Sequence, residues 1–283
     1  MNAMMVLTAG SAGQVCRARE AGADEIAVAL QGYACSGLEP FRLEQLKSLG
    51  PVSVLMNRLL FPEELESAET VLEALCSLEI PHIYFADPGL ALLAEQKGLK
   101  GRLIYRPETL VTSGQDARWW QEQGIAAVSV SPLITREELL SFCQGTEVTV
   151  YGRLLMSASR RCLLSAYGET AGLSQELRGS RTLSIREAKR SEHMPIFEDE
   201  SGTLIYTDYV LESFRFLQDL ESHGTARLYL DSALSSFESA CSAMQAYRRI
   251  LAGGDAEAER TAWLKANPAI PVSTGYYEEK TIR

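Results

Sequence analysis

The sequence has no apolar run as long as the roughly 18 residues that a membrane span requires, and its N-terminus has no basic-then-apolar signal pattern. We therefore expect a cytoplasmic protein without a membrane partner. Positive charge is also scarce: 27 Lys and Arg face 37 Asp and Glu, a formal net charge of -10 in 283 residues. Such a chain repels bulk nucleic acid unless basic residues cluster locally, so we expect no DNA partner.

Motifs for metal and nucleophilic chemistry are missing as well. The six cysteines form no C-x-x-C pair, and the chain has no H-E-x-x-H, no G-x-S-x-G and no G-x-G-x-x-G after its first expected strand. We predict no metal site, no structural disulfide, and cysteines that are mostly buried as small apolar residues. Neither His82 nor His223 stands beside a nucleophile in the sequence.

The chain does contain a strand-then-helix pattern that repeats. Eight short segments are rich in Val, Ile, Leu and Tyr and apolar on both faces, as in buried parallel strands. Eight such strands alternating with helices predict a (β/α)8 TIM-like barrel, and a doubly wound open sheet is the alternative because sequence does not show closure. The expected strands are 5–9, 25–30, 52–57, 82–87, 102–106, 126–131, 148–152 and 226–231.

Helices are predicted between the strands from apolar residues spaced three and four apart. One covers 63–80, a second begins at Val210 and runs to Leu220, and 237–251 is expected to be the last helix. Asp87 before Pro88 has the pattern of a helix N-cap followed by proline in the first turn.

The regular spacing is interrupted once, by an insertion over residues 156–207 that precedes the last helix–strand unit. Its second half predicts a β-hairpin with strands at 194–197 and 203–206. We expect a single (β/α)-barrel domain over 1–283, with this insertion serving as a lid or binding element at the end of a strand.

Polar residues at the strand ends are the candidates for chemistry, because barrel active sites lie at the carboxyl ends of the strands. We select Asn57, Glu108, Arg153 and Asp231 as candidate catalytic residues. They suggest a site for a small anionic or nucleoside-like ligand, and the alternative is that they serve as caps and turn residues. For Asp87 the cap interpretation is favoured.

A basic segment, 153–190, departs from the overall acidity. Eight Lys and Arg against three Glu give a local charge of +5. We select Arg160, Arg161, Arg178 and Arg181 as candidate RNA contacts, and a solvated surface loop is the alternative. The remaining charged residues counted are Arg153, Arg186, Lys189, Arg190, Glu169, Glu176 and Glu187.

Several short motifs, in order along the chain, resemble those of the peptidase U32 (collagenase-like) family. The hairpin region 194–203 is the closest match, and it is similar to a short, cysteine-poor branch found in Gram-positive bacteria. The resemblance covers nearly the whole chain and rests on the ordered set of motifs. The other similar segments are 22–26, 52–57, 83–88, 148–152 and 160–165.

The resemblance implies a (β/α)-barrel acting on tRNA, rRNA or a ubiquinone precursor. Oxygen-inserting members of the family hold an iron–sulfur cluster on four cysteines, some act as pairs of related subunits, and prephenate is implied as an oxygen donor. The similar branch is linked to 5-hydroxylation of the wobble uridine in tRNA.

This sequence departs from the family pattern at several of those positions. Cys162 alone matches a cluster cysteine, and Leu155 stands in place of the first. Tyr151 replaces the family's histidine, and Pro132-Leu133 replaces its Arg-Glu. Because a cluster needs four thiolates, we predict no cofactor in this chain and place any iron–sulfur cluster in a partner. Cys162 itself is expected to be core packing.

We therefore predict a U32-like subunit that supports 5-hydroxylation of tRNA wobble uridine with a cysteine-bearing U32-family partner. Its partners would be tRNA, that related subunit and prephenate. One alternative is a U32-type peptidase, for which the sequence offers no nucleophile–base pair. Another is a non-catalytic scaffold subunit, and the sequence leaves open whether this chain is itself an enzyme.

Overall fold

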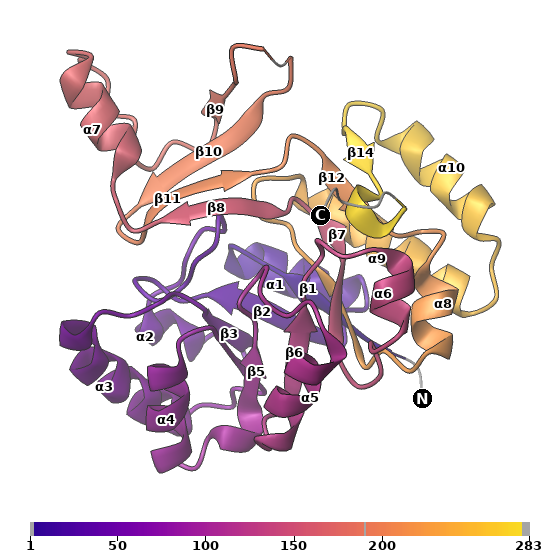
Figure 1. Cartoon of the computed structure of the whole chain (residues 1–283), viewed down its shortest axis with the longest axis horizontal. Helices are drawn as coiled ribbons and strands as arrows, with labels where there is room; N and C mark the ends of the chain where they lie inside the picture. Colours follow the sequence, from indigo (N-terminus) through magenta and orange to yellow (C-terminus); the bar gives the residue numbers. More distant parts are fainter. Residues whose placement is uncertain (1–2, 190, 279–283) are drawn as a thin grey trace.

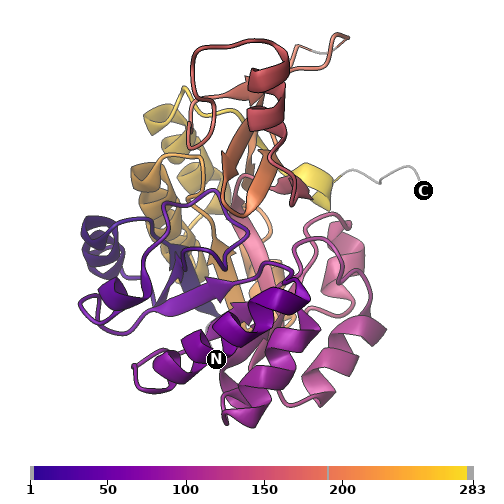
Figure 2. The same cartoon turned by 90° about the vertical axis from the view of Figure 1, so that its left-hand side faces the viewer.

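Eight parallel strands close into a barrel in the computed structural model, which describes residues 3–189 and 191–278. Strands β1 to β7 are neighbours in sequence order, and β13 pairs with both β7 and β1, which closes the ring (Figures 1 and 2). Closure confirms the predicted barrel over the open sheet. The strands are β1 (Met4–Thr8), β2 (Glu25–Ala29), β3 (Ser53–Met56), β4 (Ile83–Phe85), β5 (Leu103–Tyr105), β6 (Ala127–Val130), β7 (Glu147–Gly152) and β13 (Arg227–Leu230).

Helices cover the outside of the barrel and bury their apolar stripes against it. In α3, Ala68, Leu72 and Leu75 are fully buried, as the three-and-four spacing predicts. Asp87 caps α4 by accepting the backbone N–H groups of Gly89 and Leu90, so its capping role is confirmed. The helices are α1 (Ala12–Glu20), α2 (Leu43–Leu46), α3 (Leu65–Cys76), α4 (Pro88–Gln96), α5 (Gly114–Glu122), α6 (Arg136–Leu140), α8 (Leu217–Ser222) and α9 (Phe237–Leu251), with 3-10 turns η1 (Pro62–Glu64), η2 (Lys100–Arg102) and η3 (Gly275–Tyr277).

The strand period of two divides the barrel side chains into an outer and an inner set. In β13, Leu228 and Leu230 pack outward in the large core under the helices, whereas Tyr229 belongs to a separate inner cluster with Tyr84 and Ile104. Charged side chains occupy the remaining inner positions, and the candidate site is built on them.

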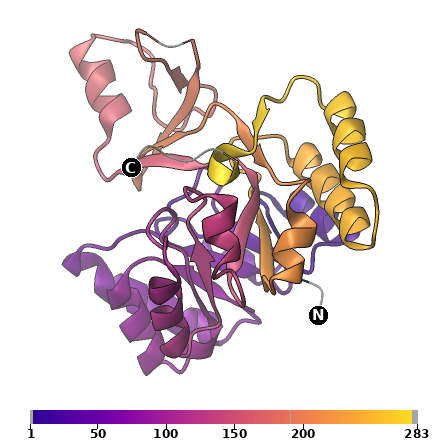
Figure 3. The same ribbon diagram turned by 45° about the vertical axis from the view of Figure 1, so that its right-hand side comes forward.

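The insertion forms a second sheet above the carboxyl end of the barrel (Figures 1 and 3). The predicted hairpin is present and pairs Asp199 with Gly202 at its turn. A Cβ on Gly202 would lie 1.9 Å from the carbonyl oxygen of Ser159, so this position requires glycine. The added elements are β8 (Leu155–Ser159), α7 (Leu163–Thr170), β9 (Ser184–Ile185), β10 (Met194–Asp199) and β11 (Gly202–Tyr206), in the sheet order β8-β11-β10-β9.

Two helix predictions near the C-terminus are wrong. The segment from Val210 is first a strand, β12 (Val210–Glu212), which pairs with β7 and β14 (Val272–Ser273), and helix α8 begins later at Leu217. The helix was expected because Val210, Phe214 and Leu217 are spaced three and four apart, but all three residues of β12 are buried, and periodicity alone does not separate a short buried strand from a helix. Helix α9 is not the last, since α10 (Ala256–Ala266) follows it and buries Trp263.

The prediction that the cysteines are mostly buried is also wrong. Cys143 is buried, whereas Cys16, Cys76 and Cys162 are exposed, and all six thiols are free. Cys162 is therefore not part of the core. It lies at the N-cap of α7 in the insertion. No helix within residues 3–189 and 191–278 is long and apolar enough to cross a membrane.

Candidate binding site at the barrel mouth

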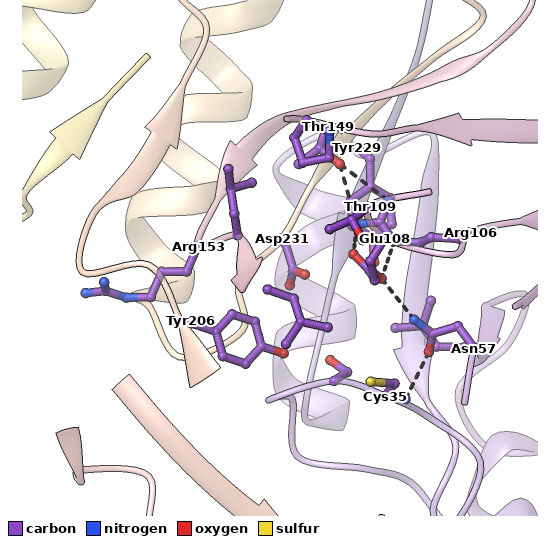
Figure 4. A pocket seen from close by; sticks show the side chains of 15 residues that line it. Cys35, Asn57, Arg106, Glu108, Thr109, Thr149, Arg153, Tyr206, Tyr229 and Asp231 are labelled. Carbon is purple, nitrogen blue, oxygen red and sulfur yellow. Dashed lines mark hydrogen bonds and ion pairs between the residues drawn. The ribbon is translucent and has the colours of Figure 1, made fainter. Parts of the chain in front are cut away.

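A polar cavity lies inside the carboxyl end of the barrel, beneath the added sheet (Figure 4). All four candidate catalytic residues of the sequence analysis line it, although they come from four different strand ends. Residues that the sequence analysis did not select complete the lining. The cavity is formed by Cys35, Ser36, Leu55, Asn57, Arg106, Glu108, Thr109, Pro132, Thr149, Arg153, Leu154, Leu155, Tyr206, Tyr229 and Asp231.

Arg106, directly after β5, is the arginine at the centre of this cavity. Its Nε donates to Glu108 Oε1 at 3.1 Å, and its Nη1 donates to Glu147 Oε1 at 3.3 Å. The guanidinium also stacks on Tyr229, 3.8 Å from the ring centroid. Burial lowers the pKa of Arg106, but Glu108, Tyr229 and Glu147 outweigh this and raise it, so the guanidinium is charged.

Glu108 turns its carboxylate into the cavity from an unusual backbone conformation, with φ of 61°. Its Oε1 accepts hydrogen bonds from Arg106 and from Asn57 Nδ2 at 3.0 Å. The Asn57 Oδ1 in turn accepts the backbone N–H of Cys35 at 3.0 Å, which fixes the amide orientation. Burial raises the pKa of Glu108, opposed by Arg106 and reinforced by Asp231.

Asp231, after β13, presents a second carboxylate to the same cavity. Its Oδ1 accepts two hydrogen bonds, from Thr8 Oγ1 at 3.1 Å and from the backbone N–H of Ala233 at 2.8 Å. Within the described part of the chain, Oδ2 therefore has no hydrogen-bond partner, and this atom is free to accept from a ligand. Burial raises the pKa of Asp231, and Arg106 partly opposes that rise.

Arg153 lines the cavity but points its guanidinium away from both carboxylates (Figure 4). Nε donates to the carbonyl of Leu234 at 3.0 Å and Nη1 to the carbonyl of Thr207 at 2.7 Å. These bonds tie the end of the added sheet to the loop after β13. The arginine that meets the carboxylates is Arg106 instead.

Tyr206, at the end of the hairpin, brings the added sheet into the mouth. Its hydroxyl accepts the backbone N–H of Gly37 at 2.8 Å, and its own proton is left for another acceptor. Figure 4 shows the hydroxyl turned toward the space between Asp231 and Cys35. The sequence analysis missed Tyr206, because a hairpin residue reaches a barrel mouth only through long-range packing. It could have selected Arg106, because the two-residue period of a strand points Arg106 inward together with Ile104.

Beneath the mouth, alternating charges continue down the barrel interior. Arg227 donates to Glu25 Oε1 at 2.6 Å and to Glu147 Oε2 at 3.1 Å, and Tyr84 also donates to Glu147. Glu147 is fully buried and has charged partners on both sides. The members in order are His82, Glu25, Arg227, Glu147, Arg106 and Glu108.

The electrostatics of the mouth favour a neutral ligand that donates and accepts hydrogen bonds. Both arginines of the lining are engaged, while Asp231 and Glu108 bring two carboxylates with raised pKa. A small anion would be repelled by these carboxylates and would find no unengaged cation among the residues that line the cavity. Of the two ligand classes suggested by the sequence, the polar lining favours the nucleoside-like one. The cavity itself holds about 20 Å³, roughly the room of one water, so only the edge of a base could reach its polar groups.

The candidate RNA contacts are separated in the structure. Arg160 lies at the rim of a groove beside the mouth, and Arg161 and Arg178 are exposed on the added sheet and its loop. Arg181 is bound to Glu39 and to the carbonyls of Gly37 and Leu38, so it fastens the insertion to the barrel. Of the other basic residues counted in the sequence, Arg190 lies outside the described residues.

Cysteine and histidine chemistry finds little support around the cavity. Burial raises the pKa of the Cys35 thiol to about 12, so the thiol is protonated at neutral pH and a poor nucleophile. None of the three histidines lines the mouth. Within residues 3–189 and 191–278 no three His, Cys, Asp or Glu side chains are placed to hold a metal, so these residues do not fit a four-thiolate cluster.

Comparison with known proteins gives two curated relatives. The chain is 21% identical to tRNA hydroxylation protein P2 of Bacillus subtilis (strain 168), over 98% of this chain and 98% of that protein. It is 22% identical to tRNA hydroxylation protein P of Escherichia coli (strain K12), over 60% of this chain and 48% of that protein. The second match thus spans about half of the longer relative.

A solved structure and a family model also match. The structure of the U32 peptidase Mk0906 aligns with a TM-score of 0.49 at 15% identity, covering 82% of this chain and 92% of that one. The model of peptidase family U32 matches residues 10–281. Because that match includes nearly the whole chain, barrel and added sheet together, the chain belongs to peptidase family U32.

Proposed function

We propose that this chain supports 5-hydroxylation of the wobble uridine of tRNA and that the uracil edge is held at the barrel mouth. The observation that carries the proposal is the full-length correspondence with the Bacillus subtilis tRNA hydroxylation protein P2, 98% of both chains. It includes the added sheet, which supplies Tyr206 to the mouth.

The mouth geometry supports a uracil as the ligand. A uracil edge offers one N–H donor between two carbonyl acceptors. Asp231 Oδ2 has no partner among the described residues and can accept the N–H, and the hydroxyl proton of Tyr206 can serve a carbonyl. A neutral base avoids the repulsion that a small anion would meet from Glu108 and Asp231.

The oxygen-inserting chemistry requires a further subunit in this proposal. The residues of this chain do not fit an iron–sulfur cluster, so we assign the cluster to a cysteine-bearing U32-family partner. Prephenate, the implied oxygen donor, carries two carboxylates and is disfavoured at the acidic mouth, so we assign its binding to the partner side of the assembly. The reaction would take place in the cytoplasm, where tRNA is modified.

The test is mass spectrometry of nucleosides from bulk tRNA of a strain that lacks the gene. The proposal predicts loss of 5-hydroxyuridine derivatives and their return when the gene is restored. A complementing Glu122→Gln variant should restore them fully, because Glu122 is exposed on α5. Normal hydroxylation in the deletion strain would refute the proposal, provided that no second copy of the gene is present.

No observation favours the peptidase alternative. The cavity lining offers hydroxyls and one protonated thiol but no histidine to activate them. Cleavage of gelatin by the purified chain, abolished by one substitution in the mouth, would reverse this assignment. The scaffold alternative predicts that hydroxylation survives every substitution in the mouth that leaves the fold intact.

A further inference from the structure

A groove runs from the mouth to the outer surface, between the barrel and the added sheet. It holds about 240 Å³ of space, close to the lower end of the roughly 300–1,000 Å³ found for ligand pockets. One wall is the edge strand β8, and the other consists of the loops after β3, β4 and β5. The groove and the mouth are continuous, since both are lined by Cys35, Asn57, Glu108, Thr109 and Leu155.

Arg58 lines this groove and is a buried cation with unused donors. The residue is 7% exposed, and its Nε is buried without a hydrogen-bond partner. Of its terminal nitrogens, Nη2 donates to Glu64 Oε1 at 2.9 Å. Among the described residues Nη1 has no partner. Leaving a buried donor unpaired is costly, and a ligand that supplies an acceptor here would remove that cost.

Arg160 brings a second guanidinium to the same carboxylate. Its Nη2 also donates to Glu64 Oε1 at 2.9 Å, and its guanidinium lies over the ring of Phe61, 4.5 Å from the centroid. Two arginines share one glutamate, which leaves a net charge of two minus one, or +1. Burial, and then Arg160, lower the pKa of Arg58, as expected for cations held together without a second anion.

Apolar side chains line the groove between this pair and the mouth. Leu59 is 63% exposed, Leu110 65% and Met156 53%, an unusual grouping for a surface with no partner in place. Together the groove and the mouth offer a cation pair, apolar side chains and hydrogen-bonding groups, which match the parts of a nucleotide.

We propose that Arg58 and Arg160 form a clamp for a backbone phosphate of single-stranded RNA, next to the nucleotide whose base enters the mouth. This inference rests on the proposed function for the identity of the RNA. The planar guanidinium of arginine can donate two parallel hydrogen bonds to phosphate oxygens. A phosphodiester would therefore supply the acceptors that Arg58 Nε and Nη1 lack. The chain has a net charge of -10 and repels RNA over most of its surface. A local pair of cations beside the site therefore determines where the RNA backbone lies.

The test measures binding of a fluorescein-labelled, seven-nucleotide single-stranded RNA with a central uridine to the purified full chain at several KCl concentrations. Arg58→Met and Arg160→Met should each weaken binding about tenfold or more. Each should also reduce the slope of log Kd against log salt by about 0.7, the loss of one phosphate contact. Arg118→Met on α5 is the matched control, since Arg118 is exposed on the barrel exterior and should change neither quantity.

Folding is checked by urea unfolding of each variant. Arg58→Met should remain folded, because Glu64 keeps its bond from Arg160 and an unpaired buried donor is removed. If it does not fold, the variant at the half-buried Arg160, Arg160→Met, still decides. Arg58→Lys should keep the wild-type slope of log Kd against log salt, because the positive charge stays. It should lose part of the RNA affinity, because lysine lacks the paired donors of the guanidinium.

Three results would overturn the clamp: no binding by the wild-type chain, wild-type affinity in both Met variants, or lost affinity with an unchanged salt slope. Displacement of the RNA by micromolar inorganic phosphate or prephenate would make the pair a small-anion site and would also refute it. Failure of the clamp leaves the nucleoside analysis of the deletion strain unaffected. Unchanged tRNA in that strain would in turn refute the proposed function while the salt-dependent RNA binding could still stand.

Discussion

Arg106 shows how one residue can join the site to the fold. Its guanidinium bonds to Glu108 at the mouth and to the fully buried Glu147 below, and it stacks on Tyr229. The sequence analysis placed Arg106 at the end of an expected strand but selected Arg153 as the arginine of the site, because Arg153 is a charge next to an apolar strand. The period-two alternation would have favoured Arg106, since Ile104 and Arg106 point the same way.

Arg106→Met should lower the free energy of unfolding by about 3 kcal/mol, because it leaves Glu147 and Glu108 with one fewer buried cation. Urea unfolding at pH 7 measures this. Arg118→Met should stay within about 0.5 kcal/mol of the wild type. An equally small effect of Arg106→Met would show that the buried ion pairs are not coupled through this residue.

Asp231→Asn should leave the free energy of unfolding at pH 7 equal to or above that of the wild type. Because burial raises the pKa of Asp231, its ionised form costs stability above the usual carboxyl range, and the neutral amide removes this cost. Asn can still accept from Thr8 and Ala233 through Oδ1. A clear loss of stability in urea would instead make Asp231 a structural partner of Arg106.

Among the elements, the added sheet depends on close contacts that sequence patterns do not reveal. The hairpin was predicted from its turn residues, but its pairing with β8 and the docking of α7 were not. Glu198 is fully buried and accepts the backbone N–H groups of Leu164 and Ser165, which fastens the start of α7 to the hairpin. Such contacts join residues more than 30 positions apart, beyond the reach of local periodicity.

Gly202→Ala should disrupt the added sheet, because its Cβ would meet the carbonyl oxygen of Ser159 at 1.9 Å with φ at 122°. Limited proteolysis should then cut residues 155–206 faster than in the wild type while the barrel stays resistant. Gly172→Ala is the control: φ is also positive at 62°, but nothing lies within 4 Å of a new Cβ, so the cost should be about 1 kcal/mol. Equal protease resistance of both variants would contradict the steric argument.

At the scale of the whole molecule, the barrel and four residues of its mouth were predictable, whereas the charged network of its interior was not. All eight barrel strands were found, because doubly buried parallel strands form continuous apolar runs. The charges that fill the interior come from strands far apart in sequence, such as Glu25, Glu147 and Arg227. Their pairing follows from closure of the barrel, which no single segment encodes.

The interior charge network gives the fold a defined acid sensitivity. Burial alone would raise the pKa of Glu25, but the hydrogen bond with His82 and the charge of Arg227 outweigh it and lower the pKa to about 2. The folded state therefore binds fewer protons than the unfolded state below pH 4.5. The stabilisation from Glu25 is complete above that pH and is lost as the pH falls toward 2.

Relative to Glu25→Gln, the wild type should thus lose about 2 kcal/mol of unfolding free energy between pH 5 and pH 3. Urea unfolding across this range measures the difference. Glu122→Gln should show no such change against the wild type, because Glu122 is exposed. A constant difference between the wild type and Glu25→Gln would show that the buried pairs do not hold Glu25 ionised.

We propose that the barrel mouth takes part in tRNA hydroxylation. The most direct measurement is the amount of 5-hydroxyuridine derivatives in tRNA from a deletion strain complemented with Asp231→Asn at matched protein level. We expect a folded variant and hydroxylation reduced to the level of the deletion strain, because the amide cannot accept the uracil N–H as the free Oδ2 does. Full hydroxylation by the Asp231→Asn strain would contradict it.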